Sequence, residues 1–421
     1  MRKKRILYII PWLPYPITTG GHLAIYSGIK AIVDDYDISL VYETWNNREY
    51  EDAKKAFQRE FPNVVHLPLV HAITKNKNNN KLRASFIKLK EFIWALVNKR
   101  KILEDQNPVN SLIKKWQSSI NPINEWWQSH LSYVFSKYSF DIVQVEMPWF
   151  LPVVFNLPDN VKKVYVHHEL GFIRRELELK RCESKDYVTT YKRFIDFNEV
   201  GQLNRYDCVV TLSEIDAYKL KIAGVNKPVS PSFVSLDCSN TGYDSCDGRT
   251  LVFIGPDYHT PNLLGLSWFL ENCWEKLLKK DESYKLKIIG KWSKERISQF
   301  RDKYRNLSFT GFVENLEKEL KGCIMIVPIL IGSGIRIKIL EACSQGVPFV
   351  STSVGAEGIP LVNGSHCFIT DDVESFVNDI ILLQEVELQK KFVSNSRKMI
   401  EDHYSLEALR KNRINIYESL F

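Results

Sequence analysis

One stretch of the sequence, residues 323–358, constrains the fold more strongly than any other. An apolar run at 323–328 is followed by the turn Gly332-Ser333-Gly334, a segment with helical spacing, and a second apolar run at 347–352. Short apolar runs that alternate with helical segments are typical of a buried parallel sheet. A glycine turn between a strand and a helix lets backbone N–H groups and the positive end of the helix dipole approach an anion. The stretch therefore predicts an α/β domain with a phosphate-binding turn.

Charged residues follow this turn at a spacing that suits a nucleotide. In a helix running through the segment, Gly334, Lys338 and Glu341 share one face, and Gly334 and Glu341 lie about 10 Å apart along the axis. Such a face offers cations for a diphosphate, to which Arg336 adds, and a carboxylate for ribose hydroxyls. The alternative is an ordinary strand–helix turn with a solvated charged face, and a short glycine motif alone does not decide between the two.

The alternation of strands and helices occurs twice along the chain of 421 residues, a length that favours two domains. The polar stretch 237–249 contains two glycines and is the best candidate for a linker. We therefore expect an α/β protein with two doubly wound, Rossmann-like domains, at 1–236 and 250–400, and a terminal helix at 401–421.

Polar residues stand where predicted strands end. Gly20 and Gly21 form a loop after the strand at 5–12, Glu146 ends the strand at 140–146, and His167 and His168 follow the strand at 161–166. The carboxyl ends of parallel strands line the ligand crevice of an open α/β sheet. We expect one of the two histidines to be functional; hydrogen bonding without ligand contact is the alternative.

The composition is that of a soluble globular protein, with 44% hydrophobic and 25% charged residues. Apolar runs are shorter than the ~18 residues of a membrane span. The eight cysteines are scattered and lack metal-ligand spacing. We therefore expect a cytoplasmic protein with reduced thiols, no metal site and no cofactor.

Positive charge is concentrated in one segment. Residues 75–116 contain eleven basic and three acidic side chains, whereas the whole chain carries a net charge of +7. Apolar residues interleave at helical spacing, which predicts a basic amphipathic helix. Such a helix suits an anionic membrane surface or an anionic lipid carrier. A surface helix with a solvated basic face is an equally good interpretation, and nucleic acid is a weaker one, so none is expected as a partner.

Taken together, the motifs resemble those of group 1 glycosyltransferases, the glycosyltransferase family 4-like enzymes with the GT-B fold. The similarity covers nearly the whole chain and is strongest at 250–360. The matching residues are Phe253-Ile254-Gly255, Pro261-Asn262, Gly311-Phe312-Val313, the run from Gly332 to Ala342, and Gly355-Ala356-Glu357-Gly358. The match is looser at Gly20-Gly21, His167-His168-Glu169 and Ser213-Glu214.

The resemblance implies two domains that face each other across a cleft, with a nucleotide-diphospho-sugar on the second and an acceptor on the first. Its terminal helix crosses back onto the first domain. By position, Gly311, Phe312 and Val313 would flank the base, and Glu341 would hold the ribose. The phosphates would lie at Gly332, Ser333, Gly334 and Ile335, with Gly255 and Asn262 in the same donor-binding set. Gly20 and Gly21 would approach the donor, His167 would bind it, and His168 would act on the transferred sugar.

Two departures from the family pattern shape the expected chemistry. Ser333 stands where the wider family has a glutamate, and the loop 255–259 lacks the usual arginine and lysine. Arg336 and Lys338 are therefore the expected catalytic cations. We expect a retaining, metal-independent transferase that uses a glycan or lipid-linked glycan acceptor in polysaccharide biosynthesis, at the inner face of the membrane if the basic segment binds lipid. The alternatives are a sugar-nucleotide epimerase and a non-catalytic donor-binding partner in a glycan-assembly complex.

Overall fold

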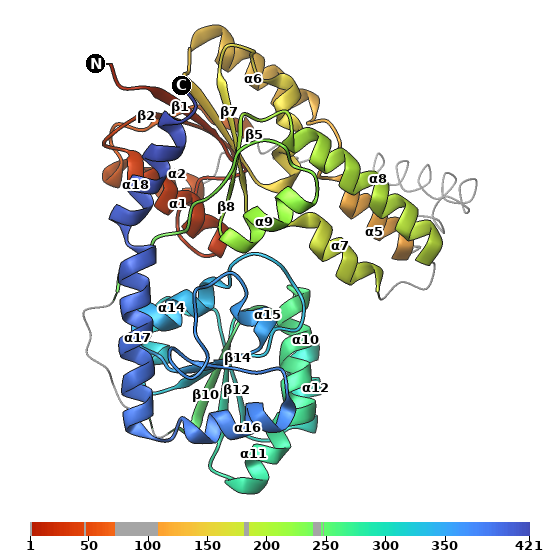
Figure 1. Ribbon diagram of the computed structural model, residues 1–421, viewed down its shortest axis with the longest axis vertical. Helices are drawn as coiled ribbons and strands as arrows, with labels where there is room; N and C mark the ends of the chain where they lie inside the picture. The colour runs from red at the N-terminus through yellow and green to blue at the C-terminus, as the bar shows by residue number, and fades with distance from the viewer. Residues whose placement is uncertain (1, 46–47, 72–107, 181–184, 239–245, 247) are drawn as a thin grey trace, which may run out of the picture. The chain divides into compact units, whose positions relative to one another are not determined.

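The computed structural model describes residues 2–45, 48–71, 108–180, 185–238, 246 and 248–421 (Figure 1). The chain divides into two compact units. Unit 1 comprises Met1–Thr211, Lys219–Ser230 and Tyr417–Phe421, and unit 2 comprises Leu212–Tyr218 and Pro231–Ile416. Most of the predicted basic helix, and most of the predicted linker, lie outside the described residues. Within the described part of the chain, no helix is both long enough and apolar enough to cross a membrane.

Unit 1 is built on a seven-stranded sheet whose inner strands are buried on both faces. In spatial order its strands are β4 (Val65–His66), β2 (Asp37–Val41), β1 (Arg5–Ile9), β6 (Ile142–Glu146), β7 (Lys162–His167), β8 (Cys208–Thr211) and β9 (Val229–Pro231). The neighbouring strands from β4 to β8 pair in parallel. Strands β3 (Glu43–Trp45) and β5 (Leu69–His71) form a separate parallel pair. The sequence pattern predicts a strand over 63–68, of which only the two residues of β4 form one.

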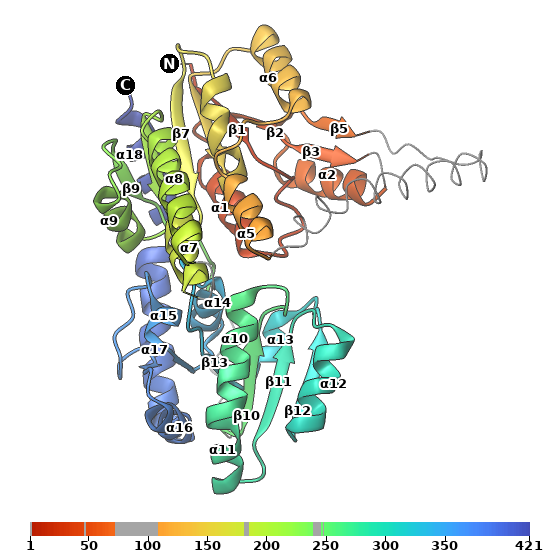
Figure 2. The same ribbon diagram turned by 90° about the vertical axis from the view of Figure 1, so that its right-hand side faces the viewer.

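Helices surround this sheet. They are α1 (Gly20–Ile32), α2 (Arg48–Glu60), α5 (Pro108–Gln117), α6 (Glu125–Lys137), the 3₁₀ segment η1 (Pro148–Asn156), α7 (Gly171–Leu179) and α8 (Lys185–Leu203). Helix α9 (Glu214–Ile222) belongs to unit 2 up to Tyr218 and to unit 1 from Lys219. Helices α5, α7 and α8 pack together (Figures 1 and 2). The helical spacing of apolar residues over 112–138 predicts one helix, but the structure has two, α5 and α6. The chain breaks around Pro122, and the side chain of Asn124 caps α6 by accepting a hydrogen bond from the N–H of Trp127 at 3.0 Å.

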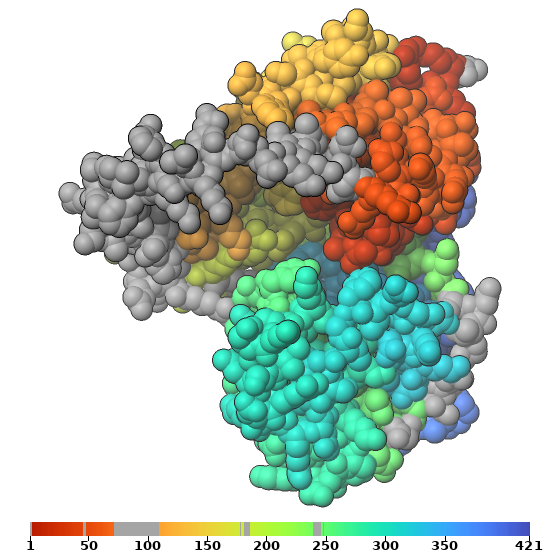
Figure 3. All heavy atoms as spheres, turned by 180° about the vertical axis from the view of Figure 1, so that it is seen from behind, coloured from red at the N-terminus to blue at the C-terminus, as the bar shows by residue number. Residues whose placement is uncertain are grey.

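Unit 2 contains a six-stranded sheet in which the neighbouring strands are parallel. In spatial order its strands are β12 (Leu307–Gly311), β11 (Lys285–Ile289), β10 (Thr250–Ile254), β13 (Ile324–Val327), β14 (Phe349–Ser351) and β15 (Phe368–Ile369). Its main helices are α10 (Thr260–Phe269), α11 (Glu275–Lys280), α12 (Lys294–Lys303), α13 (Leu316–Leu320), α14 (Ile337–Gln345), α15 (Ser353–Ala356), α16 (Val373–Leu382) and α17 (Val386–Tyr404). Figure 3 shows unit 2 from the side where the turquoise and cyan chain between α11 and α13 forms the surface.

The C-terminal segment is two helices rather than one. Helix α17 ends at Tyr404, Ser405 is extended with φ −70° and ψ 153°, and α18 (Leu406–Glu418) follows. The last residues, Tyr417–Phe421, belong to unit 1. There the buried Tyr417 hydroxyl donates a hydrogen bond to Gln144 of β6.

The order of strands reverses once in each sheet. In unit 1 the chain moves outward from β1 through β2 to β4, and then from β6 through β7 to β8 on the other side. In unit 2 the same reversal separates β10 from β13. Ligands of open α/β sheets bind at the carboxyl ends of the strands where such a reversal occurs. The two sheets therefore define one candidate binding edge each, between β1 and β6 and between β10 and β13.

Candidate functional site

Lys338 lies at the strand reversal of unit 2. It belongs to the first turn of α14, and its ammonium group donates to the carbonyl oxygen of Ile254, the last residue of β10. A second hydrogen bond of 2.8 Å reaches Oδ1 of Asn262, at the start of α10. The same nitrogen lies 5.1 Å from the ring centroid of Phe253. The ammonium group is therefore held at the end of β10 by groups from β10 and from α10, the helix that follows it.

Gly255 makes this arrangement sterically possible. Its φ is +147°, and a Cβ atom there would lie 2.4 Å from Nδ2 of Asn262. The buried Asn262 side chain also donates to the carbonyl of Pro256 at 3.2 Å, which fixes the orientation of its amide. Because the amide oxygen faces Lys338, any side chain at position 255 would displace a partner of the ammonium group. The structure thus brings together three of the predicted site residues, Gly255, Asn262 and Lys338.

Burial controls the charge of this group. Desolvation, reinforced by the nearby charge of Arg336, lowers the pKa of Lys338 to about 7, although Glu341 opposes the shift. Desolvation also raises the pKa of Glu341 above its ordinary value, against the effect of Lys338. An anion placed beside Lys338 would favour its protonated form, so the site is built to gain positive charge when an anion binds.

The glycine turn differs from the predicted geometry. Helix α14 begins at Ile337, because Arg336 is extended with φ −88° and ψ 90°, so Gly334 is not on a common helical face with Glu341. Both Gly332 (φ +135°) and Gly334 (φ +78°) have backbone angles that favour glycine. The guanidinium of Arg336 folds back and donates to the carbonyl oxygens of Ser333, at 2.8 Å, and Gly334. Arg336 therefore closes the turn that contains Ser333 and the partly buried Ile335.

The predicted base-flanking residues lie farther along the same edge of the sheet. Gly311 ends the edge strand β12, which is separated from β10 by β11. Its φ of +75° favours glycine, and its carbonyl oxygen accepts a hydrogen bond from the N–H of Gly290 at 2.8 Å. Phe312 follows with 67% of its surface exposed, and Val313 is half-buried. The exposed ring of Phe312 thus stands beside the carboxyl end of the sheet, where a flat ligand group could stack.

In unit 1, Gly20 and Gly21 lie beside the strand reversal. They form the first turn of α1 rather than the predicted loop, because the Thr19 hydroxyl caps the helix by accepting from the N–H of His22 at 3.2 Å. A Cβ atom at Gly21 would lie 2.9 Å from Cε of Met147, the residue that follows β6. The absence of a side chain therefore allows the helix end after β1 to approach the end of β6.

His168 is held at this edge by a carboxylate. Its Nε2 lies 2.7 Å from Oε2 of Glu146, the last residue of β6, which is only 2% exposed. The other oxygen of Glu146 accepts a hydrogen bond of 2.6 Å from Nε2 of Gln144. With the Tyr417 hydroxyl that donates to Gln144, four side chains form a chain that fixes the imidazole. A histidine oriented in this way by a buried carboxylate is suited to contact or exchange a proton with a ligand.

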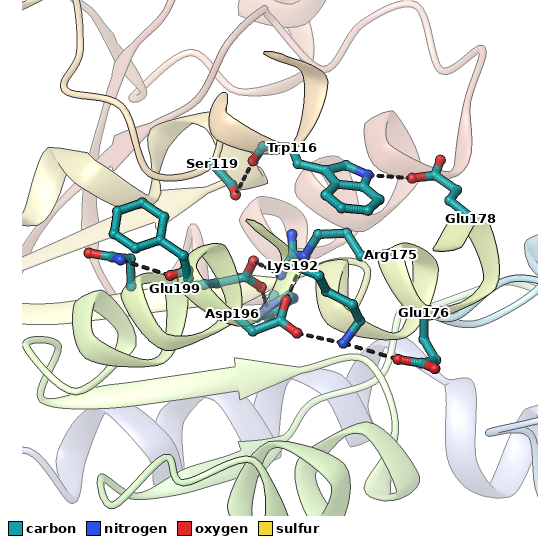
Figure 4. Close-up of polar contacts among 11 residues, drawn as sticks. Trp116, Ser119, Arg175, Glu176, Glu178, Lys192, Asp196 and Glu199 are labelled. Carbon is teal, nitrogen blue, oxygen red and sulfur yellow. Dashed lines mark hydrogen bonds and ion pairs between the residues drawn. The ribbon is translucent and has the colours of Figure 1, made fainter. Parts of the chain in front are cut away.

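His167 points to the other side of the sheet and contacts Glu199 in a buried ion-pair cluster. Figure 4 shows Arg175, Lys192, Asp196 and Glu199 of this cluster. It is the last residue of β7 rather than the residue after it, and its Nε2 lies 3.6 Å from Oε1 of Glu199 on α8. Arg175 of α7 donates to Glu199 at 2.5 Å and to Asp196 at 2.7 Å, and Lys192 contacts Asp196 at 2.6 Å. Burial alone would raise the pKa of Glu199, but His167 and Arg175 outweigh it and lower the pKa to about 2. His167 therefore anchors helices to the sheet, and the donor contact predicted for it remains a prediction.

Sequence reasoning missed the partners of both histidines. Glu146 was recognisable as a carboxylate at a strand end, but its pairing with His168 depends on β6 and β7 being neighbours. Glu199 lies on a long helix in a charged stretch, and no motif marks it. The signal that separates the histidines is their adjacency, because consecutive residues of a strand point to opposite faces.

Residues 248–385 match the family Glycosyl transferases group 1. They include the strand reversal of unit 2, Lys338 and the glycine turn. This segment is a group 1 glycosyltransferase domain. A curated relative, an uncharacterized 44.6 kDa protein in the cps region of Klebsiella pneumoniae, is 30% identical over 173 residues, which are 38% of this chain and 45% of the relative. The chain is thus matched to less than half of that relative's length.

Solved structures show the fold of the rest of the chain. The chain is similar to a mutant of S. aureus TarM in complex with fondaparinux, alpha-GlcNAc-glycerol and UDP, with a TM-score of 0.67, 14% identity, and coverage of 98% of this chain and 99% of that one. It is also similar to Anabaena Alr3699/HepE in complex with UDP-glucose, with a TM-score of 0.63, 12% identity, and coverage of 99% and 100%. The group 1 domain thus belongs to a chain with the GT-B fold. The predicted fold class is confirmed, and the predicted glycosyltransferase class is confirmed for this domain.

Proposed function

We propose that the chain transfers a sugar from a nucleotide-diphospho-sugar to a glycan or lipid-linked glycan acceptor in the synthesis of a polysaccharide. The observation that carries this proposal is the position of Lys338, a partly buried cation at the strand reversal of a group 1 glycosyltransferase domain. The relative from a cps region supports a role in polysaccharide synthesis. The complexes of TarM with UDP and of HepE with UDP-glucose make uridine donors the first to test.

The chemistry requires stabilisation of a departing diphosphate. In our proposal the bond between the sugar C1 and the diphosphate oxygen breaks, and the acceptor hydroxyl oxygen bonds to C1 on the same face, with retention. The acceptor proton passes to the leaving diphosphate. Lys338, Arg336 and the N–H groups of the glycine turn stabilise the developing negative charge without a metal ion. His168, oriented by Glu146, contacts the transferred sugar, and Glu341 holds the ribose.

A donor screen tests this function. We expect nucleoside diphosphates and sugar nucleotides to raise the melting temperature of the protein, with one base preferred, and the preferred sugar nucleotide to support acceptor-dependent release of the nucleoside diphosphate. Arg336→Ala and Glu341→Ala should both reduce this release strongly while circular dichroism shows a folded protein. Wild-type turnover by both variants would contradict the assignment, and acceptor-independent conversion of the donor would instead indicate an epimerase.

We further propose that the protein is cytoplasmic and attaches peripherally to anionic membrane through the basic segment 75–116. The excess of basic over acidic residues in this segment supports the proposal. Purified protein should sediment with vesicles containing anionic lipid at low salt and be released at high salt. Failure to sediment at low salt would rule this attachment out.

A further inference from the structure

A pocket opens at the carboxyl edge of the unit 1 sheet. Its volume is about 380 Å³, and it is lined by Pro11, Glu43, Ser118, Asn121, Pro122, Ile123, Asn124, Trp127, Trp149 and Phe150. Pro11 follows β1, Glu43 follows β2, and Trp149 follows β6, so the pocket lies on both sides of the strand reversal. The break between α5 and α6, which the sequence does not predict, supplies the opposite wall.

One wall of this pocket is aromatic. Trp149 leaves 41% of its surface exposed, whereas Phe150 and Trp127 are almost fully buried and pack with ring centroids 4.6 Å apart. The ring of Trp12 packs against the ring of Trp149, with centroids 5.8 Å apart. A tryptophan held partly open in a concave site provides a flat apolar surface on which a ligand can stack.

The other wall is polar and fixed in orientation. The indole N–H of the buried Trp127 donates to Oε1 of Glu43, so the carboxylate is oriented by the core beneath it. Asn121 is exposed at the rim. A wholly apolar ligand would remove water from these groups without replacing its hydrogen bonds, and a phosphate would be repelled by the carboxylate. An aromatic face beside a carboxylate and an amide fits a neutral ligand that has C–H groups on one face and hydroxyls at its edge.

We propose that this pocket binds one neutral pyranose unit of the glycan acceptor, stacked on Trp149 with its hydroxyls bonded to Glu43 and Asn121. This inference rests on the proposed function, because it places the acceptor sugar on the unit that lacks the group 1 domain. The volume of the pocket suffices for a single sugar ring with bound water, so longer acceptors would extend out of its open side.

The test uses the full chain and a panel of methyl glycosides of glucose, galactose, mannose, rhamnose and N-acetylglucosamine, observed by saturation-transfer NMR. We expect transfer to the ring protons of at least one glycoside, reduced at least about threefold in Trp149→Ala and in Glu43→Gln. Glutamine can still accept from Trp127, so the second variant removes the charge and keeps the packing. The control is Trp126→Ala, which removes a more exposed tryptophan of α6, 61% exposed and outside the pocket lining. It should leave the signal unchanged.

Two results would overturn the inference: saturation transfer to none of the glycosides, or signals that both pocket variants leave unchanged. Titration of the same samples with UDP-glucose and UDP-N-acetylglucosamine separates this failure from that of the proposed function. Sugar-nucleotide binding without glycoside binding would reject the pocket and leave the transferase assignment in place. Glycoside binding without sugar-nucleotide binding would keep the pocket as a sugar-binding site and reject the transferase assignment.

Discussion

The two strand reversals of this chain have the same topology and opposite chemistry. Between β10 and β13, glycine-rich backbone surrounds the partly buried Lys338, and carbonyl and amide oxygens are its nearest partners. Beside the reversal between β1 and β6, His168 after β7 is paired with the buried carboxylate of Glu146 at the end of β6, and the half-open Trp149 lines a pocket with a second carboxylate. The first edge is suited to an anion and the second to a neutral polyol. In our proposal this difference separates donor from acceptor: the two sheets provide similar positions, and the residues just after the strands provide the selectivity.

Replacing the partly buried cation Lys338 should have the largest effect. Lys338→Met keeps the length and apolar stem of the side chain but removes its charge, so transfer should fall by about 100-fold, since hydrogen bonds to charged groups contribute roughly 1.5–3 kcal/mol each. Initial rates of nucleoside diphosphate release measure this effect. Lys276→Met, which removes a surface ion pair with Glu374, is the matched control and should retain full activity. Equal loss in both variants would point to general destabilisation instead.

The unit 1 edge should respond differently. Glu146→Gln leaves a hydrogen-bond acceptor for His168 but removes the charge, so turnover should fall roughly tenfold or more. Its dissociation constant for UDP, which lacks the transferred sugar, should not change, because the diphosphate is assigned to unit 2. Glu178→Gln, in an ion pair with Lys115 on the helices, is the control. A loss of UDP affinity in Glu146→Gln would contradict the division between the two edges.

The pH dependence of donor binding should report on Lys338. Because burial lowers its pKa to about 7, the free protein loses this charge as the pH rises through 7, and a bound diphosphate restores it. Affinity for a sugar nucleotide should therefore weaken above pH 7, by at most about tenfold per pH unit for one linked proton. The stability of the free protein should instead increase as the pH rises. Since the unfolded chain binds more protons between pH 7 and 10.5, this group makes the free energy of unfolding rise with pH in that window. Calorimetry between pH 6.5 and 8.5 tests the predicted weakening of sugar-nucleotide affinity, and an affinity that does not change with pH would contradict it. In the control Lys338→Arg, the affinity should not change with pH.

A glycine pair tests the packing behind each edge and should give the smallest effect. Gly28 in α1 and Gly265 in α10 lie in the helices that follow the first strand of each sheet. A Cβ at Gly265 would lie 2.4 Å from the carbonyl oxygen of Pro328, whereas a Cβ at Gly28 has nothing within 4 Å. Gly265→Ala should destabilise the protein by roughly 1–3 kcal/mol as an overpacked site, and Gly28→Ala should stabilise it by about 0.5–1 kcal/mol. Chemical denaturation measures both, and destabilisation by Gly28→Ala would contradict the packing described for α1.

The sequence predicted much of the fold but only part of the site. Apolar runs and glycine turns located most strands to within two residues, because strands buried on both faces leave a strong local signal. Helix breaks were harder, since α5 and α6 are separated by one cap and one proline inside a continuously amphipathic pattern. Lys338 was identified as a cation near the phosphates, but its burial against Ile254 and Asn262 joins residues more than 70 positions apart in the sequence. Arg336 was expected on the helix. Its extended backbone instead places it just before α14, and its side chain folds back onto the glycine turn.

Titration of the wild type, Lys338→Met and Glu146→Gln with UDP at pH 6.5 tests the central claim most directly, because it asks which edge binds the diphosphate. The wild type and Glu146→Gln should bind one equivalent with similar dissociation constants, and Lys338→Met should bind at least about tenfold more weakly, the equivalent of 1.4 kcal/mol. Undiminished binding by Lys338→Met, or weakened binding by Glu146→Gln alone, would contradict the assignment of the donor to the group 1 domain.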